Sequence, residues 1–102
     1  VHIRVQDVPY HKEAYEMAEM GFIPAGAYRN RDFAEASVKV VGDVARALQD
    51  ICYDPQTSGG LLCAVPEAEA AACLAELRAV AADAAVIGYV TEQLEQPIYL
   101  EA

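Results

Sequence analysis

The chain has 102 residues, 55% of them hydrophobic, a size that fits one domain or a piece of one. Sixteen acidic against seven basic residues give a formal net charge of -9. This excludes a general nucleic-acid or anionic-membrane surface, because such surfaces rely on Lys and Arg. No apolar run approaches the roughly 20 residues of a bilayer span, and no signal-peptide pattern is visible. We therefore expect a cytoplasmic protein with neither nucleic acid nor membrane as a partner.

The first predicted element is a strand over 2–6, because Ile3 and Val5 alternate with polar residues until Pro9 ends the pattern. A strand so close to the first residue leads us to expect a piece cut from a longer chain. A helix follows, ending near the glycine that suits a helix C-terminus. Its apolar stripe is Tyr10, Ala14, Met17, Ala18 and Gly21.

The segment 22–33 is predicted to be a long loop, because Pro24 and Gly26 interrupt any regular element. The β-branched residues of 37–41 predict a second strand. Asp43 is then a plausible N-cap for a helix. The buried face of that helix is expected to comprise Val44, Leu48, Ile51 and Cys52.

The apolar run 61–65 predicts a short strand buried on both faces. Pro66 falls where a helix begins, and 85–91 and 97–101 read as two closing strands. The buried stripe of the helix is expected to be Ala70, Cys73, Leu74, Leu77, Val80 and Ala81. The order of elements predicts a single domain over 1–102 of the α/β (α+β) class, with a layered mixed sheet covered by helices.

The three cysteines, Cys52, Cys63 and Cys73, lie among apolar residues without the C-x-x-C spacing of a zinc or redox site. We expect reduced, buried thiols. His2 and His11 have no further Cys or His nearby, and we expect both at the surface. No metal site is predicted.

The stretch "DPQTSGG", Asp54 to Gly60, carries the equipment of an anion-binding loop. Gly59 and Gly60 can adopt positive φ and admit a ligand to the backbone, and Thr57 offers a hydroxyl, as does the serine that follows it. However, the loop leads into a predicted strand rather than a helix N-terminus, and no Lys follows the glycines. From the residues alone, a tight turn feeding a buried strand is favoured over phosphate binding.

The stretch "YRNRD" offers a second candidate, because Arg29 and Arg31 can form charge-assisted bonds to a phosphate or carboxylate, and Asn30 can hold a turn or a ligand. The alternative is a solvated loop whose arginines pair with neighbouring acids. No Ser-His-Asp or Cys-His arrangement is present, so the residues do not make a complete active site.

Two of these stretches resemble one protein family. "DPQTSGGLL" resembles a signature of selenophosphate synthetase, also called selenide, water dikinase, and "GFIPAGAYRNRD" resembles that family's loop with the pattern G-hydrophobic-hydrophobic-P-G-G-x-x-x-N. The closing "VIGYVT" is also similar, so the resemblance covers nearly the whole chain. It implies the C-terminal domain of the aminoimidazole ribonucleotide synthetase superfamily, which is partly ferredoxin-like. Ala25 and Ala27 depart from the family's glycine and small polar residue.

The resemblance implies a parent enzyme that makes selenophosphate from selenide, ATP and water, releasing AMP and phosphate. It implies a dimer of two-domain chains in which an N-terminal domain holds ATP and Mg²⁺ through aspartates and carries a catalytic Lys with a Cys or selenocysteine. This chain resembles only the later part of the C-terminal domain. We therefore expect it to lack the catalytic residues, to bind no cofactor alone, and to have the N-terminal ATP-binding domain and a second copy as partners.

On the same resemblance, two loops would form one wall of the active-site cleft near the phosphates. The residues are Thr57, Ser58, Gly59 and Gly60, with Arg29, Asn30 and Arg31 as weaker candidates. Two rivals stay open: a stand-alone module of the same fold that binds a small anion or a protein partner, and a purely structural domain. Because the helical segment that normally opens the domain is absent, we expect exposed apolar surface and self-association.

Overall fold

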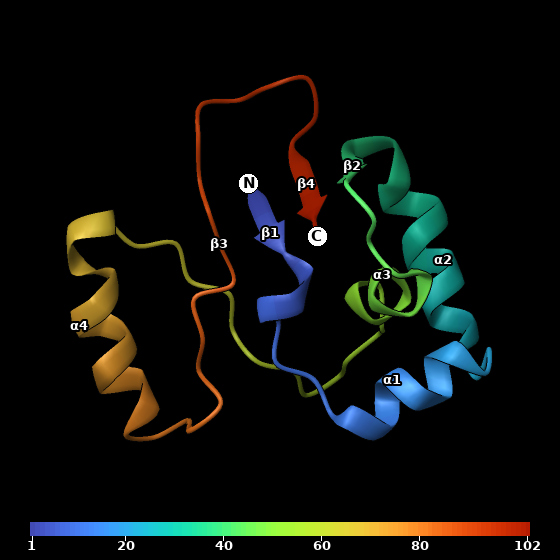
Figure 1. The fold of residues 1–102 in the computed structure, drawn as a ribbon, viewed down its shortest axis with the longest axis horizontal. Helices are drawn as coiled ribbons and strands as arrows, with labels where there is room; N and C mark the ends of the chain where they lie inside the picture. Colours follow the sequence, from blue (N-terminus) through green and yellow to red (C-terminus); the bar gives the residue numbers. More distant parts are fainter.

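A computed structural model describes all residues from Val1 to Ala102. It is a mixed α/β structure, which confirms the predicted class (Figure 1). In chain order the elements are β1 (His2–Arg4), η1 (Val5–Asp7), α1 (Lys12–Glu19), α2 (Ala25–Ala34), η2 (Glu35–Ser37), β2 (Val38–Val41), α3 (Arg46–Cys52), α4 (Glu67–Arg78), β3 (Gly88–Tyr89) and β4 (Ile98–Glu101). None of the helices combines the length and apolar character that a bilayer crossing requires.

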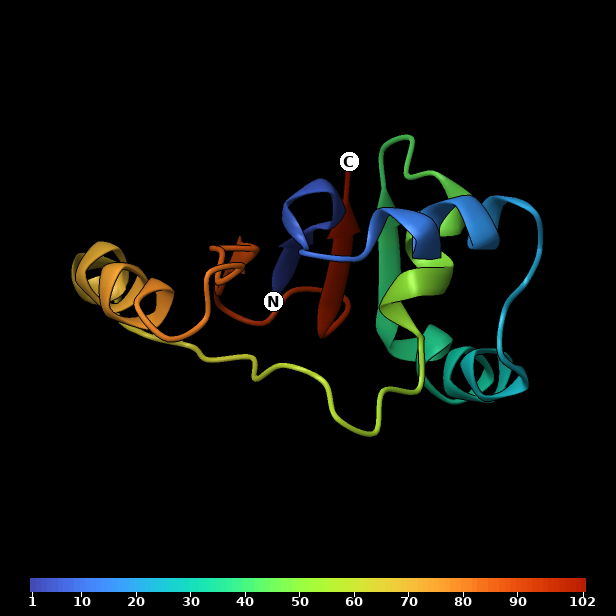
Figure 2. The same cartoon turned by 90° about the horizontal axis from the view of Figure 1, so that it is seen from below.

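The four strands form one mixed sheet in the order β2-β4-β1-β3. Strand β4 runs parallel to both of its neighbours, and β3 pairs antiparallel with β1. Helices α1, α2 and α3 gather on the β2 side of the sheet, whereas α4 lies beyond the β3 edge (Figures 1 and 2). The long segment from α3 to α4 runs across the molecule between these two groups.

The core is small and lies where α3 and the segment before it meet the sheet. Val5, Val44 and Leu100 are buried against one another, with half-buried side chains of Ile3, Val38, Leu48 and Ile98 around them. Only ten of the 102 residues are buried. Large apolar side chains such as Phe33, Leu61 and Val80 remain almost fully exposed. The sheet is therefore held by a narrow contact, and much apolar surface is left uncovered.

Helix α1 forms and ends as its sequence predicts. Gly21 takes a φ of +82°, the left-handed conformation that a helix C-terminus favours in glycine. The amide of Phe22 donates to the carbonyl of Met17 at 2.9 Å, which satisfies one of the last carbonyls of the helix. The chain then turns sharply toward α2.

The loop predicted over 22–33 is wrong, because α2 occupies most of it. Pro24 lies immediately before the first helical residue, where no N–H is required, and its carbonyl accepts from Ala27 at 2.9 Å. Gly26 falls in the first turn, and alanines on either side of it favour the helix. The departures from the family pattern at Ala25 and Ala27 therefore fall within a helix, which needs no positive φ.

Three further expectations about elements are also wrong. Helix α3 begins at Arg46 after Ala45, without a side-chain cap, so Asp43 is not its N-cap. The run 61–65 belongs to no strand, and Leu61 is 95% exposed. An apolar run predicts a strand only where a neighbouring strand can pair with it, and none does here. The strand expected over 85–91 is reduced to β3.

Several burial expectations fail for the same reason, because few elements pack on one another. Cys52 and Cys63 are exposed and Cys73 is half-buried, although all three thiols are free. The stripe expected for the helix after Pro66 is at most half-buried, and Val80, which follows the end of α4, is 87% exposed. In the opposite sense, His2 is buried rather than at the surface. Its ring is stacked at 4.6 Å from that of Tyr89 and, on the other face, 4.6 Å from that of Tyr99.

Candidate functional site

The DPQTSGG loop borders an open hollow of about 610 Å³. The hollow is lined by the segment that joins η1 to α1, by the last turn of α3, and by the loop itself. From the loop and the helix end, the lining residues include Cys52, Asp54, Gln56, Thr57, Gly59 and Gly60. The loop thus lies at the edge of an open hollow rather than an enclosed pocket.

The charge of this hollow is the wrong sign for an isolated phosphate. Its lining contains the carboxylate of Asp54 and no Lys, Arg or His. A phosphate bound here would meet hydroxyl and amide donors but no positive charge. The lining itself therefore supplies no positive charge to such a ligand.

The glycines of the loop do not take up the conformation of an anion nest. Positive φ occurs only at Gly21 and Gly42. A Cβ added at Gly59 would come 2.6 Å from Oε1 of Gln56, a flexible side chain, and one added at Gly60 would meet nothing within 4 Å. The space over Gly60 is therefore open to a group from outside the chain.

The three residues of "RNR" lie on α2 and have different roles. Arg31 is buried, forms an ion pair with Asp50 of α3, and lies with its guanidinium carbon 5.5 Å from the centroids of the Tyr28 and Tyr53 rings. Asn30 Nδ2 donates to the carbonyl of Tyr53 at 2.9 Å. The arginine-and-acid pairing expected as the alternative therefore describes Arg31, while Arg29 is exposed.

The ionisable side chains at the end of α3 are tuned by burial. Although Cys52 is exposed as a residue, the atoms packed around its sulfur raise the pKa of the thiol. Burial also raises the pKa of the Tyr53 phenol, with Arg31 acting in the opposite direction. A thiol with a raised pKa stays protonated at neutral pH and is a poor nucleophile.

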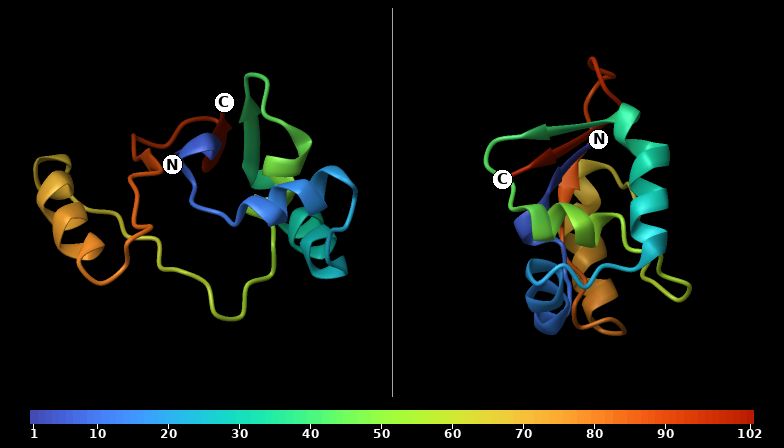
Figure 3. Two further views of the ribbon diagram at one scale, coloured as in Figure 1. Left: turned by 60° about the horizontal axis from the view of Figure 1, so that its bottom comes forward. Right: turned by 90° about the vertical axis from the view of Figure 1, so that its right-hand side faces the viewer.

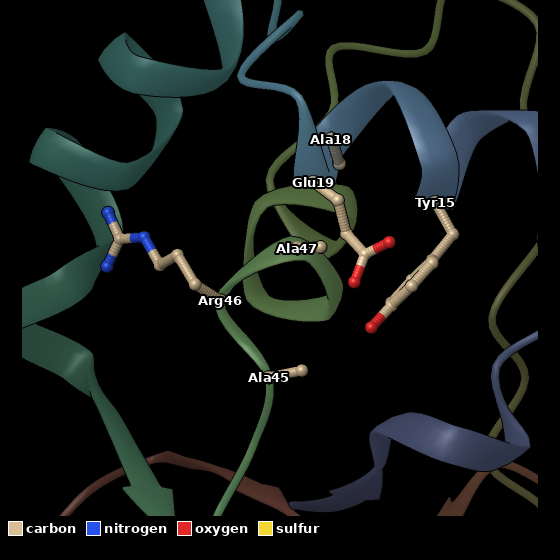
Figure 4. A pocket seen from close by; sticks show the side chains of 6 residues that line it. All are labelled: Tyr15, Ala18, Glu19, Ala45, Arg46 and Ala47. Carbon is tan, nitrogen blue, oxygen red and sulfur yellow. The ribbon is translucent and has the colours of Figure 1, made fainter.

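A smaller hollow of about 280 Å³ lies between α1 and the start of α3 (Figure 4). Tyr15 and Glu19 extend side by side from α1, and a hydrogen bond with the Glu19 carboxylate raises the pKa of the Tyr15 phenol. Arg46 points away from the hollow, toward α2. Nowhere in the structure do three His, Cys, Asp or Glu side chains gather around a position for one ion.

Two of the residues that line the hollow, Cys52 and Asp54, are not among the site residues predicted from the sequence. Asp54 lies inside the DPQTSGG motif, so its presence in the motif was a usable signal. For Cys52 the only signal was its place in the helical turn before the motif. That place indicates that Cys52 is near the loop but not that it lines the hollow. The loop is thus brought to the hollow with its flanking residues, while Asn30 and Arg31 are held against α3.

Comparison with known proteins agrees with this architecture. A family model described as AIR synthase related protein, C-terminal domain, matches residues 1–100. The chain belongs to this family. No solved structure matches.

Within the family, the chain is similar to selenide, water dikinases, as the motif resemblance indicated. It is 47% identical to "Selenide, water dikinase" of Pelobacter propionicus over 99% of this chain and 29% of the relative. It is 43% identical to "Selenide, water dikinase" of Clostridioides difficile over 96% of this chain and 28% of the relative. The chain thus spans under a third of the length of these curated relatives.

Proposed function

We propose that the chain is part of the C-terminal domain of a selenophosphate synthetase. The parent reaction would convert selenide, ATP and water into selenophosphate, AMP and phosphate. The observation that carries the proposal is the 47% identity to a selenide, water dikinase over 99% of this chain. Identity of this extent between domains of one family supports a shared role in a common reaction.

In this proposal the DPQTSGG loop is one wall of the active-site cleft. Thr57 lines the hollow, Ser58 is exposed beside it, and the space over Gly60 is open. Hydroxyl and backbone donors at such a wall orient a phosphate, and the compensating charge comes from the other domain. The lack of basic residues in the hollow supports this division between the two domains.

By the same reasoning, the chain is not catalytic alone. The raised pKa of Cys52 leaves its thiol protonated, and no Lys lines the hollow. The chain has no cluster of three acidic, thiol or imidazole side chains that could hold an ion by itself. Mg²⁺ is commonly held by one or two carboxylates together with substrate phosphates, and in this proposal those carboxylates belong to the N-terminal domain. We therefore assign neither a metal-binding nor a proton-transfer step to this chain.

In this proposal the chain has two partners. One is the N-terminal domain of the parent polypeptide, and the other is a second copy of that polypeptide in a homodimer. A compact monomer of 11.0 kDa exposes about 5,600 Å² on average, whereas this chain exposes 7368 Å². The excess, roughly 1,700 Å², exceeds what each partner buries in a standard interface of about 800 Å² per side. The uncovered Leu61 and Leu62 contribute to it. Three free thiols suit a reducing compartment such as the cytoplasm.

The direct test is a chimera of the Pelobacter propionicus enzyme in which residues 1–102 replace the matching segment. We expect the chimera to form AMP and selenophosphate in a selenide-dependent way, detected by chromatography and phosphorus NMR. The isolated chain is expected to form neither product. An inactive chimera that folds and binds ATP like its parent would count against the proposal.

The contribution of the wall is tested in the same chimera by Thr57→Ala and Ser58→Ala. Loss of a hydrogen bond to a charged phosphate is expected to lower kcat/KM by about tenfold or more. A matched control is Thr91→Ala, which removes a hydroxyl whose partners are Glu92 and His2, away from the loop. Saturable binding of phosphate by the isolated chain would instead favour a stand-alone anion-binding module.

A further inference from the structure

The entry to the DPQTSGG loop lies directly against the start of α2 (Figure 3). A Cβ placed on Gly26 would come 2.6 Å from Cγ and 3.1 Å from Cβ of the Pro55 ring. Distances below 3.0 Å are not tolerated by packed carbon atoms, so the proline ring rests on helix backbone that only a glycine leaves open. The first turn of α2 therefore touches the loop without an intervening side chain.

A second contact lies one turn further along α2. Asn30 is four residues after Gly26 and therefore on the same face of the helix. Its Nδ2 donates to the carbonyl of Tyr53 at 2.9 Å, at the point where α3 ends. The last carbonyls of a helix lack intrahelical partners, so this bond both caps α3 and ties the residue before Asp54 to α2.

A third contact clamps the same end of α3. Arg31 of α2 forms a buried ion pair with Asp50, and its guanidinium carbon lies 5.5 Å from the ring centroids of both Tyr28 and Tyr53. The planar guanidinium suits stacking against aromatic rings while it is paired with a carboxylate. Arg31 therefore contacts the ring of Tyr53, and Asn30 donates to the carbonyl of the same residue.

We propose that α2 is a seat for the DPQTSGG loop and that Gly26, Asn30 and Arg31 are positioning residues. They act through Tyr53 and Pro55, which they hold in place, and so determine where Thr57 and the rest of the loop stand. None of the three touches a ligand in this role. The seat itself is a property of this chain, while its consequence for phosphoryl transfer rests on the proposed function.

The decisive variant is Gly26→Ala, because helix propensity and the seat predict opposite results. Propensity predicts a better α2 and an unchanged loop. The seat predicts that the new methyl displaces Pro55, so amide NMR signals from Asp54 to Gly60 shift while most of the chain keeps its signals. The exposed Asp32→Ala change in the same helix is the matched control and should leave the loop signals in place.

A rescue variant separates the seat from a general structural effect. Pro55→Ala removes the ring atoms closest to the added methyl. We expect the loop signals of the double variant Gly26→Ala, Pro55→Ala to match those of Pro55→Ala alone. Asn30→Ala should speed hydrogen exchange at Tyr53 and at the amide of Asp54, which donates to Ile51, by about tenfold.

The same variants in the chimera connect the seat to the reaction. Gly26→Ala is expected to lower kcat several-fold with little change in the KM for ATP, and Pro55→Ala is expected to restore part of it. Unmoved loop signals in Gly26→Ala, or equal shifts in Asp32→Ala, would overturn the seat. Shifted loop signals with unchanged kcat and KM would leave the seat standing and refute the proposed function of the loop.

Discussion

Loss of the Asp50 carboxylate is expected to lower the free energy of unfolding, because Asp50 joins α3 to α2. It is 7% exposed, lies in α3, and receives Arg31 from α2 and Arg46 from its own helix, the latter at 3.3 Å. The Asp50→Ala change would leave the buried Arg31 guanidinium near two tyrosine rings but without its closest counter-charge. Burial of an unpaired charge is far more costly than loss of an exposed pair.

The expected loss is about 3–5 kcal/mol in the free energy of unfolding, the range for breaking one side of a buried pair. The total free energy of unfolding of a native domain is roughly 5–15 kcal/mol, so this loss removes between about a fifth and all of it. Urea unfolding followed by far-ultraviolet circular dichroism measures the loss as a lower midpoint at unchanged slope. Loop signals from Asp54 onward should shift as well, because the clamp on Tyr53 is lost.

Arg46→Ala is the matched control, since it removes the other partner of Asp50. The Arg46 side chain is 63% exposed, so its loss should cost less than about 1 kcal/mol. A second check is the double change Asp50→Leu, Arg31→Met, which removes both charges and should recover part of the stability. The reasoning fails if Asp50→Ala and Arg46→Ala cost the same, or if removing both charges is worse than removing one.

Three other perturbations follow from the structure. Lys39 donates to Glu95 at 2.8 Å, and this bond lowers the pKa of Glu95 and raises that of Lys39. The stability from the pair is therefore present at neutral pH and declines as pH falls through the lowered pKa of Glu95 or rises through the raised pKa of Lys39. Glu95→Gln should flatten both limbs of a plot of urea midpoint against pH, and unchanged limbs would contradict the assignment. His2→Ala removes the stacks on Tyr89 and Tyr99 and the hydrogen bond to Glu101, and is expected to lower the free energy of unfolding by about 2–3 kcal/mol, measured by thermal unfolding. His2→Phe keeps the stacks and should cost less, so equal losses in the two variants would exclude stacking as the cause. Changing Leu61 and Leu62 to serine should reduce self-association of the isolated chain in sedimentation velocity. An unchanged distribution of sedimentation coefficients would show that the chain associates through another surface.

The parts of the fold that followed from the sequence are those set by local periodicity. Alternation in β1, the β-branched residues of β2 and the stripe of α1 carry their own signal, and the structure has each element within a few residues of the prediction. Helix α2 was missed because Pro24 and Gly26 were read as breakers, although the first turn of a helix accommodates both. Strand formation at 61–65 depends on a neighbouring strand, which no local pattern reveals.

In the candidate site too, local sequence predicted some features, whereas others depend on residues far along the chain. The composition of DPQTSGG marked the loop, and the structure places that loop beside a hollow. The contacts of Asn30 and Arg31 were beyond the sequence, because their partners Tyr53 and Asp50 lie 23 and 19 residues further along. The alternation of helix and loop gives no information on which face of α2 meets α3. Charge pairing of an arginine was foreseen as an alternative, but its partner was not.

The place of β4 in the sheet has a consequence for how the chain folds as it is synthesised. Ile98–Glu101 lies between β1 and β2 and is parallel to both, so the two earlier strands do not touch each other. A nascent chain that has grown as far as Tyr89 can pair β1 only with β3. The sheet closes only when β4 leaves the ribosome and pairs with β1, which ends at Arg4, and with β2, which ends at Val41. Contacts between strands so far apart in the chain raise the contact order, so folding is expected to be slow. Until then, β2 presents unpaired edges to any chaperone or neighbouring chain.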